Sequence, residues 1–523
     1  MVKETQPVPA LDVKSVLNQR QYNVDVAWLL APWLTVSLTQ SLSGMTLDSR
    51  EIQQGDLFVA LQGSINDGRR FIKNAINAGA AVVLAETTDK TTDGQIRFEA
   101  TTPIIEIYQL GQHLSALAMR FYFPQKNLHS ITAITGTNGK TTIASLLANS
   151  YMLLNQQSAQ MGTIGNGLYG QLKSSLNTTL DAISVCRELQ HYQSQGAKHT
   201  IMEVSSHGLV QGRVAAIPFE TAIFTNLTRD HLDYHGTLEA YALAKKTLFT
   251  EFPLQHRIIN ADDAVGQAWL KAFPNAIAYG VNAQQYFSNQ PFFSIKKVQY
   301  LAQGISFEFT SSWGDGVINA PFYGDFNVSN IAAVCCALLA DGFSIKQIAD
   351  VIAKLTVVPG RMEQYFFAQQ QVTFVVDYAH TPDALLNALK ALQNHKQKGR
   401  IIAVFGCGGD RDKGKRPEMA KMAEQGADQV VIVDDNPRSE NAQQIVEDIK
   451  KGLTQPELAL VIHDRKQAIL HLLQSAQAND IILIAGKGHE DYQIFGDKKI
   501  HYSDRECLSD LIENKEKQQE QSV

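Results

Sequence analysis

Short apolar runs alternate with helix-like stretches along most of the chain. Runs at 57–61 and 80–85 flank one such stretch and predict a small α/β unit. The pattern restarts at 131–134, where a predicted strand leads through a Gly-rich loop into a stretch with helical apolar spacing. Helical stretches also separate five later apolar runs, which predicts a doubly wound, mostly parallel sheet with a ligand site at the carboxyl ends of its strands. These five runs lie at 372–376, 401–405, 430–433, 459–462 and 481–485.

The length of the chain and an interruption at Pro359-Gly360 divide this pattern into three parts. At about 150 residues per domain, 523 residues correspond to roughly three domains. We expect an α/β protein with a small N-terminal α/β domain over 1–110. A central, P-loop ATPase-like domain with a mostly parallel sheet should cover 111–358, and a C-terminal Rossmann-like doubly wound domain should cover 359–523. Apolar residues make up 44% of the chain, which is enough for a core in each part.

Composition and charge narrow the possible functions. There are 46 basic and 52 acidic residues, a net charge of -6, and no stretch concentrates Lys and Arg among aromatic residues, which argues against a nucleic-acid partner. The five cysteines contain no CxxC pair, so neither a disulfide framework nor a zinc site is predicted. Residues 1–24 lack a secretory signal pattern, and the longest apolar segment, 331–340, is far shorter than the roughly 18–20 residues of a membrane helix. We therefore expect a cytoplasmic protein with no membrane insertion.

A Gly-rich loop at 136–142, with the sequence Gly-Thr-Asn-Gly-Lys-Thr-Thr, lies between a predicted strand and a predicted helix. In such a loop backbone N–H groups approach a phosphate, Lys140 bridges terminal phosphates and Thr141 ligates Mg²⁺. The loop departs from the standard Walker A pattern, whose first glycine would fall at Ile134. An ordinary Gly-rich turn is the alternative, and the strand–loop–helix context disfavours it.

Two charged residues fall where burial is expected. Glu203 follows a predicted buried strand, and its partner could be a Mg²⁺ ion on ATP phosphates or an arginine. Lys245 lies on the apolar face of a predicted helix, and spacing alone favours snorkelling or an ion pair over a specialised role. The other residues on this face are Leu238, Tyr241, Ala242, Leu248, Phe249 and Phe252.

Three polar loops follow predicted strands in the last third of the chain. They lie at 406–416, at 435–438 (Asp-Asn-Pro-Arg) and at 486–490 (Gly-Lys-Gly-His-Glu). The first loop has Arg411 where a GxGxxG motif needs its third glycine, so a dinucleotide fingerprint is not supported. Arg438 is the residue type that binds a carboxylate bidentately. Together the loops predict a pocket for a small charged molecule.

Six motifs in combination resemble those of the Mur ligases, and within that family the branch that adds diaminopimelate, the third amino acid of the peptidoglycan stem. The motifs lie at 136–142, 177–179, 203–207, 225–235, 377–382 and 435–438. The resemblance extends from about Leu47 to about residue 510. It implies an ATP-dependent ligase that forms a C–N bond in peptidoglycan synthesis, and hence a role in cell wall biogenesis, cell shape and cell division. The implied substrates are UDP-N-acetylmuramoyl-L-alanyl-D-glutamate, meso-diaminopimelate and ATP.

The resemblance also implies roles for matching positions. ATP would contact Gly136, Thr137, Asn138, Gly139, Lys140, Thr141, Thr142, Arg361 and Asp377. The UDP-muramoyl-dipeptide would contact Leu47, Ser49, Ser64, Ile65, Asn66, Asn177, Thr178, Thr179, Ser205, Gln211 and Arg213. Diaminopimelate would contact Arg411, Asp435, Asn436, Pro437, Arg438, Gly486 and Glu490. Two Mg²⁺ ions would be held by Thr141, Glu203, His231 and Lys245, the last as a carbamate (N6-carboxylysine), and Lys140, Lys245, His231 and Glu203 would be catalytic. Relatives often have a His where this chain has Ser64.

In the implied mechanism, the D-glutamyl γ-carboxylate attacks the γ-phosphate of ATP, and the amine of the third amino acid then attacks the resulting acyl phosphate. A lysine-adding Mur ligase and a folylpolyglutamate synthetase-like ligase are the nearest alternatives. A P-loop switch or motor protein would show a full Walker A motif, and a nucleotide-binding scaffold would bind ATP without turnover. The three-domain plan and net charge are compatible with a monomer.

Overall fold

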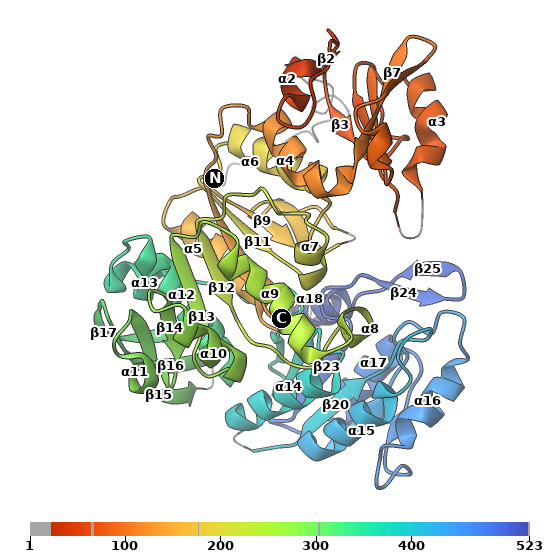
Figure 1. The fold of residues 1–523 in the computed structure, drawn as a ribbon. Helices are drawn as coiled ribbons and strands as arrows, with labels where there is room; N and C mark the ends of the chain where they lie inside the picture. Colours follow the sequence, from red (N-terminus) through yellow and green to blue (C-terminus); the bar gives the residue numbers. More distant parts are fainter. Residues whose placement is uncertain (1–21, 64–66, 176, 302–303, 397, 521–523) are drawn as a thin grey trace, which may run out of the picture.

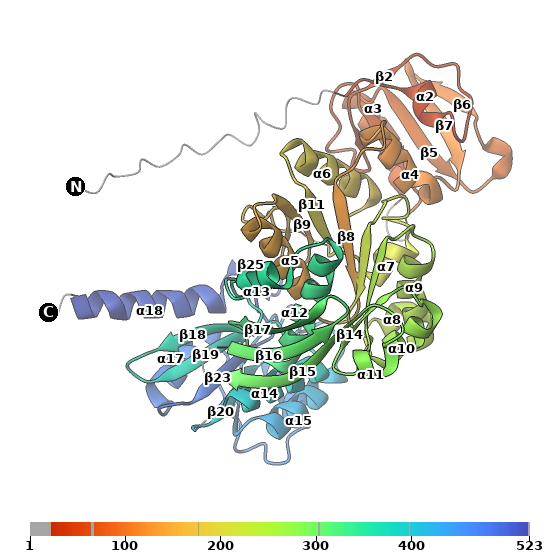
Figure 2. The same cartoon turned by 90° about the vertical axis from the view of Figure 1, so that its left-hand side faces the viewer.

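The computed structural model describes residues 22–63, 67–175, 177–301, 304–396 and 398–520. Within these residues, three β-sheets of five, ten and six strands with covering helices follow one another along the chain, accompanied by two two-stranded sheets (Figure 1). Viewed from the side, the first and third sheets lie at opposite ends of the molecule, with the central sheet between them (Figure 2). The α/β fold class is therefore confirmed, whereas the exact domain boundaries stay predictions.

The first sheet has the strand order β3-β4-β5-β7-β6, parallel except for β6 against β7. Its core joins the core of the central part, because α4 packs both on β5 and against α6. The elements here are β1 (Val24–Asp25), α2 (Val26–Leu30), β2 (Ser41–Leu42), β3 (Met45–Thr46), β4 (Leu57–Ala60), η1 (Gly68–Phe71), α3 (Ile72–Asn77), β5 (Val82–Thr87), η2 (Lys90–Thr92), β6 (Ile96–Glu99), β7 (Thr102–Tyr108) and α4 (Leu110–Tyr122).

The central sheet has the order β10-β9-β11-β8-β12-β13-β14-β15-β16-β17, in which the β10–β9, β15–β16 and β16–β17 pairs are antiparallel and the other pairs are parallel. Alternate residues of its strands face different cores. Ala133 packs in the core with α6 and α9, whereas Ile134 packs in the core with α5 and α12. The strands are β8 (Ser130–Thr135), β9 (Ser158–Gly162), β10 (Gly165–Leu168), β11 (His199–Glu203), β12 (Thr221–Phe224), β13 (His256–Asn260), β14 (Ile277–Gly280), β15 (Phe292–Leu301), β16 (Gly304–Ser311) and β17 (Gly314–Ala320).

The central helices begin at side-chain caps in several places, as their sequences favour: Asp181, Thr237, Asp263 and the capping box of Ser344 each precede one. The helices are α5 (Lys140–Leu153), α6 (Ala182–Ser194), α7 (Ser206–Val210), α8 (Leu232–His235), α9 (Leu238–Thr250), α10 (Ala264–Ala272), α11 (Ala283–Phe287), α12 (Asp325–Ala340) and α13 (Ile345–Ile352).

The third sheet has the order β18-β19-β23-β20-β21-β22, and all five apolar runs predicted as strands are strands in it. Only β18, at one edge, is antiparallel, so the carboxyl ends of the other five share one rim. Its strands are β18 (Glu363–Phe367), β19 (Val372–Asp377), β20 (Ile401–Phe405), β21 (Gln429–Ile432), β22 (Leu460–Val461) and β23 (Ile481–Ala485), and a separate hairpin follows with β24 (Tyr492–Phe495) and β25 (Lys498–His501). The helices are α14 (Pro382–His395), α15 (Lys415–Gly426), α16 (Ala442–Lys450), α17 (Arg465–Ser475) and α18 (Asp504–Glu520).

Candidate active site

The loop between β8 and α5 has the conformation that a phosphate cradle needs. Gly136 has φ +146°, and a Cβ at this position would lie 1.9 Å from Thr225 Oγ1, so only glycine fits. The N–H of Thr137 donates to Asn226 O at 2.8 Å, and the N–H of Asn138 donates to Asn226 Oδ1 at 3.0 Å. The end of β12 thus holds the loop from one side and fixes it at the N-terminus of α5.

Lys140, the first residue of α5, folds back onto this loop. Its Nζ donates to Gly136 O at 2.9 Å and to Thr137 O at 2.8 Å, so its acceptors are backbone carbonyls rather than a carboxylate. Burial lowers the pKa of Lys140, Glu203 opposes that shift, and Arg361 of the third part adds to it. When a phosphate enters the loop, the ammonium of Lys140 can donate its hydrogen bonds to phosphate oxygens in place of these carbonyl oxygens.

Glu203 ends β11 as a fully buried carboxylate, and no arginine of the described residues forms a hydrogen bond or ion pair with it. Thr163 N donates to its Oε1 at 2.8 Å, Thr163 Oγ1 donates to Oε2 at 3.2 Å, and Thr141 Oγ1 donates to Oε2 at 2.9 Å. The alternative of a buried Glu–Arg pair is therefore wrong. All three donors are neutral, so Glu203 accepts no charged hydrogen bond, although the charge of Lys140 acts on it from nearby. A cation bound directly to this carboxylate would lower the cost of burying it.

The oxygens of Thr141 and Glu203 are the hard ligands that suit Mg²⁺, which binds few protein groups and completes its shell with water and phosphates. Within the described ranges, no group of three or more His, Cys, Asp or Glu forms a ready-made metal cage. His231, at φ +53°, points its Nε2 toward Asp230 Oδ2 at 3.4 Å. The structure thus brings two of the four predicted ligands together and leaves the roles of His231 and Lys245 as predictions.

Lys245 is buried, with 1% of its surface exposed, on the inner face of α9. Its Nζ donates to Gly136 O at 2.9 Å and lies 4.5 Å from the centre of the Tyr241 ring. Burial, followed by the nearby charge of Lys140, holds the pKa of Lys245 well below its usual range. Snorkelling, which spacing alone favoured, is therefore wrong, because the amine stays inside. Of the other residues predicted on this face, Tyr241, Leu248 and Phe249 are buried as expected. Ala242 is partly exposed, Leu238 is 40% exposed at the start of the helix, and Phe252 is buried but lies beyond the end of the helix.

Most residues predicted to hold the dipeptide meet beside Glu203. Thr179 Oγ1 donates to Glu203 O at 3.0 Å and accepts from Ser205 N at 3.0 Å. Arg213 donates through Nη1 to Thr179 O at 2.6 Å and through Nε to Gln211 Oε1 at 2.9 Å. Thr178 Oγ1 lies 3.1 Å from Thr163 Oγ1, which connects this group to the carboxylate site. Asn177 is exposed next to them.

The other positions predicted to contact the UDP-muramoyl-dipeptide lie in the first part of the chain. Leu47 and Ser49 directly follow β3 and are partly exposed. Ser64, Ile65 and Asn66 lie outside the described residues.

Arg361 and Asp377 are neighbours at the start of the third part. Asp377 accepts hydrogen bonds from the N–H groups of Met362 and Ala379, both at 2.8 Å. Burial raises the pKa of Asp377, and the charge of Arg361 opposes the shift. The guanidinium of Arg361 lies 4.6 Å from the centre of the Tyr378 ring, and its Nε is buried without a hydrogen-bond partner in the described residues. A buried donor in that state is suited to an incoming acceptor such as a phosphate.

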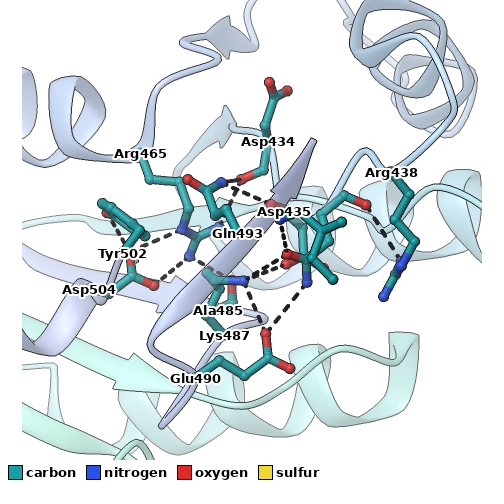
Figure 3. Close-up of polar contacts among 12 residues, drawn as sticks. Asp434, Asp435, Arg438, Arg465, Ala485, Lys487, Glu490, Gln493, Tyr502 and Asp504 are labelled. Carbon is teal, nitrogen blue, oxygen red and sulfur yellow. Dashed lines mark hydrogen bonds and ion pairs between the residues drawn. The ribbon is translucent and has the colours of Figure 1, made fainter. Parts of the chain in front are cut away.

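The loops after β21 and β23 meet at the rim of the third sheet (Figure 3), and the loop after β20 joins them through Gly409, as predicted. Gly409 N donates to Asn436 O at 2.9 Å, and Lys487 Nζ contacts Asp435 Oδ1 at 3.2 Å and Glu490 Oε2 at 3.0 Å. Lys487 was not among the predicted site residues. A lysine between two glycines in a loop carries no periodic signal, and only the folded contacts reveal its burial.

Arg438 is held in an uncommon backbone conformation at this rim. Its φ is +53°, which is strained for a residue with a side chain, and β24 fixes it through Arg438 N to Ile494 O at 3.0 Å and Gly496 N to Arg438 O at 2.8 Å. Its Nη1 donates to Gly409 O at 2.8 Å, so the acceptor of this hydrogen bond is a carbonyl rather than a carboxylate. Arg411, in contrast, is exposed and donates to the carbonyl of its neighbour Asp410. Pro437 and Gly486 supply the backbone of the two loops.

A second buried ion pair supports the same rim and was also missed from the sequence. Arg465, at the start of α17, donates to both carboxylate oxygens of Asp504 at 3.0 and 2.7 Å and to Ala485 O at 3.2 Å (Figure 3). The pair thereby ties the end of β23 to α17 and α18.

Among the helices that the structure describes, none is both long and apolar enough to cross a membrane.

Comparisons with known proteins cover nearly the whole chain. The Mur ligase family, catalytic domain, matches residues 41–122, the Mur ligase middle domain matches 134–338, and the Mur ligase, glutamate ligase domain matches 360–488. The UDP-N-acetylmuramoyl-L-alanyl-D-glutamate--2,6-diaminopimelate ligase of Vibrio cholerae is 48% identical over 93% of this chain and 98% of its own length. A solved structure of a ligase with the same name is 36% identical with a TM-score of 0.69, covering 94% of this chain and 99% of that one.

A MurF ligase from Thermotoga maritima, solved in complex with ADP, shares the fold at 18% identity, with a TM-score of 0.59 over 91% of this chain and 98% of that one. The three family matches follow one another in the order of the three sheets, and the identity to the Vibrio cholerae protein extends through all of them. The chain therefore belongs to the Mur ligase family.

Proposed function

We propose that this protein is the ATP-dependent ligase that joins meso-diaminopimelate to the D-glutamyl γ-carboxylate of UDP-N-acetylmuramoyl-L-alanyl-D-glutamate in peptidoglycan precursor synthesis. The observation that carries the proposal is the pairing of a phosphate loop beside the buried carboxylate of Glu203 with an amino-acid rim around Arg438, in a chain 48% identical to a ligase of that name. The proposal places the protein in the cytoplasm as a monomer.

The reaction proceeds through an acyl phosphate. The γ-carboxylate, oriented by the group around Thr179 and Arg213, attacks the γ-phosphate of ATP, and ADP leaves. The loop at 136–142 and Lys140 hold the phosphates, which is positioning and charge compensation rather than covalent catalysis. The amine of diaminopimelate then attacks the acyl carbon, and phosphate leaves from the tetrahedral intermediate. Closure of the third part over this site would exclude water, which otherwise hydrolyses the acyl phosphate.

Thr141 and Glu203 would hold one Mg²⁺, and His231 with a carbamate of Lys245 would serve a second. Magnesium would supply charge compensation on the transferring phosphoryl group. The chemistry of Lys245 supports the carbamate: an amine must be neutral to react with CO₂, and burial next to Lys140 favours the neutral form. The product is an anion within reach of the phosphate loop, because the amine now contacts Gly136 O.

Arg438 explains the choice of amino acid. Diaminopimelate has a carboxylate at its far end where lysine has none, and an arginine held by a carbonyl can bind that carboxylate bidentately. Loss of this charge-assisted pair costs about 2 kcal/mol or more, which is about 30-fold in selectivity. We expect Arg438→Ala to lose its preference for diaminopimelate over lysine, measured as the ratio of kcat/KM values. An unchanged ratio contradicts this assignment.

The test of the proposed function is product identification. The protein is incubated with ATP, Mg²⁺, the UDP-muramoyl-dipeptide and one amino acid from a panel that includes meso-diaminopimelate and lysine, and the product is identified by mass. Phosphate release should require both the dipeptide and diaminopimelate. A lysine adduct as the main product, or release of phosphate with a folate acceptor instead, contradicts the proposal, as does ATP binding without turnover.

A further inference from the structure

Lys487 is a fully buried lysine in the loop after β23, among the side chains of the amino-acid rim. None of its side chain is exposed, whereas its partners Asp435 and Glu490 keep 16% and 17% of theirs exposed. Its Nζ lies 3.2 Å from Asp435 Oδ1, 3.0 Å from Glu490 Oε2 and 3.4 Å from Asn436 Oδ1 (Figure 3). The ammonium therefore stands behind the two carboxylates, and they face outward in front of it.

The two carboxylate oxygens touch the same ammonium, so they are at most about 6.2 Å apart. Without a cation between them, two like charges at this distance repel each other, and the side chains would turn apart. Lys487 thus fixes the separation of these two side chains.

The backbones of these loops are held independently of Lys487. Gln493 Nε2 donates to the carbonyl oxygens of Asp434 and Asp435 at 3.2 and 2.8 Å, and Ile494 N donates to Asn436 Oδ1 at 3.0 Å. The buried Arg465 pins the carbonyl of Ala485 at 3.2 Å. Removal of the Lys487 charge should therefore alter the electrostatics of the rim without releasing the loops.

The charges at the rim match the far end of diaminopimelate better than that of lysine. Two carboxylates, Lys487 and Arg438 together have no net charge, and the far end of diaminopimelate, an ammonium with a carboxylate, has none either. Lysine brings an ammonium alone. Without the charge of Lys487 the rim would be negative. It would then bind the cationic end of lysine more favourably, and the preference for diaminopimelate over lysine would fall.

On the basis of the proposed function, we propose that Lys487 is a positioning residue that sets amino-acid specificity: it balances Asp435 and Glu490, so that the rim accepts a zwitterionic end and disfavours a cationic one. It acts through these carboxylates and does not itself touch the substrate, since no part of it is exposed. Selectivity against lysine then depends on a buried charge as well as on Arg438.

The experiment compares Lys487→Met with the wild type and with the control Lys499→Met. Lys499 lies 3.9 Å from the centre of the Tyr492 ring, the same ring that Lys487 approaches to 5.4 Å, but it is exposed on β25. Initial rates of phosphate release are measured over concentration series of diaminopimelate and of lysine, and circular dichroism records the thermal unfolding of each protein. We expect Lys487→Met to raise the KM for diaminopimelate and to lower the ratio of kcat/KM for diaminopimelate to that for lysine by about tenfold or more. Lys499→Met should keep the wild-type ratio.

A purely structural role would reduce turnover of both amino acids equally, so an unchanged ratio overturns the proposal. If Lys487→Met does not fold, Lys487→Gln, which is neutral but keeps a hydrogen-bond donor, takes its place with the same expected shift. Failure of both variants to fold overturns the proposal in favour of a structural role. Failure of the proposed function is seen separately, because the wild type would then form no diaminopimelate product.

Discussion

Replacement of Gly162 by alanine gives a direct test of the carboxylate site. Gly162 ends β9, and a Cβ built on it would lie 2.1 Å from Glu203 Oε1, 2.6 Å from its Cδ and 2.7 Å from its Cγ. Real Cβ atoms do not approach closer than 3.0 Å, so the Glu203 carboxylate must retreat by at least about 0.9 Å. The backbone angle at Gly162 suits any residue, so the clash with Glu203 is the main effect.

The displacement would break the contacts that aim the carboxylate. Thr163 N and Thr141 Oγ1 now donate to it at 2.8 and 2.9 Å, and neither hydrogen bond survives a shift of this size without rearrangement. Misplacement of a positioning group by about 1 Å costs roughly 100-fold in rate, or about 2.7 kcal/mol in the barrier. Overpacking should also lower the free energy of unfolding by about 1–3 kcal/mol.

The assay is phosphate release with all three substrates at a series of Mg²⁺ concentrations. We expect Gly162→Ala to lower kcat by about 100-fold and to raise the Mg²⁺ concentration needed for half-maximal rate, with the KM for diaminopimelate unchanged because its rim lies in another part of the chain. Gly111→Ala serves as control: it lies in α4, and its Cβ would have only Glu86 Oε1, at 3.2 Å, nearby. A Gly162→Ala enzyme within threefold of wild type at every Mg²⁺ concentration refutes the reasoning.

Three further predictions follow from charged groups. Lys245→Ala should lose more than about 100-fold in kcat and regain part of it with added acetate, which replaces a carbamate, whereas the adjacent Lys246→Ala should stay near wild type; full activity without acetate contradicts the carbamate. Asp504→Asn leaves Arg465 buried with its charge uncompensated, so urea unfolding should show a loss of about 3–5 kcal/mol in the C-terminal part, and no loss would contradict the importance of this pair. The pKa of Glu440 is lowered from 4.5 to about 2, chiefly by hydrogen bonds from the buried guanidinium of Arg416. The contribution of Glu440 to stability is therefore present above about pH 4.5 and is lost as the pH falls toward 2. Between pH 5 and pH 3 the urea midpoint of Glu440→Gln should therefore fall less than that of the wild type, and equal slopes would show that this carboxylate does not contribute.

Sequence patterns predicted the parts of the fold that depend on local periodicity. The five strands of the third sheet are present where apolar runs of four or five residues predicted them, because a strand buried on both faces needs continuous apolar residues. The antiparallel strands β16 and β17, which extend the central sheet, and the edge strand β18 were not predicted. Strands that pair at an edge depend on partners that the local pattern does not name.

The candidate site shows the same division. The Gly-rich loop identified the phosphate cradle because glycine at a positive φ, next to a lysine and between strand and helix, is a local requirement. The position of Lys245 on a buried face was also visible from helical spacing, but its contact with Gly136 O joins residues 109 positions apart. Only the fold could show that its amine is inside rather than snorkelled.

The sequence by itself determined the elements with a clear apolar period, the phosphate loop and the residue types that carry charge. Tertiary structure decided which groups each charge contacts. Glu203 accepts hydrogen bonds from neutral donors, Arg438 donates to a carbonyl, and Lys487 is buried between two carboxylates. The physical reason is that the cost of a buried charge depends on every group within a few ångströms, and those groups come from strands and loops distant in sequence. Periodicity reports the face on which a residue lies, whereas its chemistry depends on the groups opposite it.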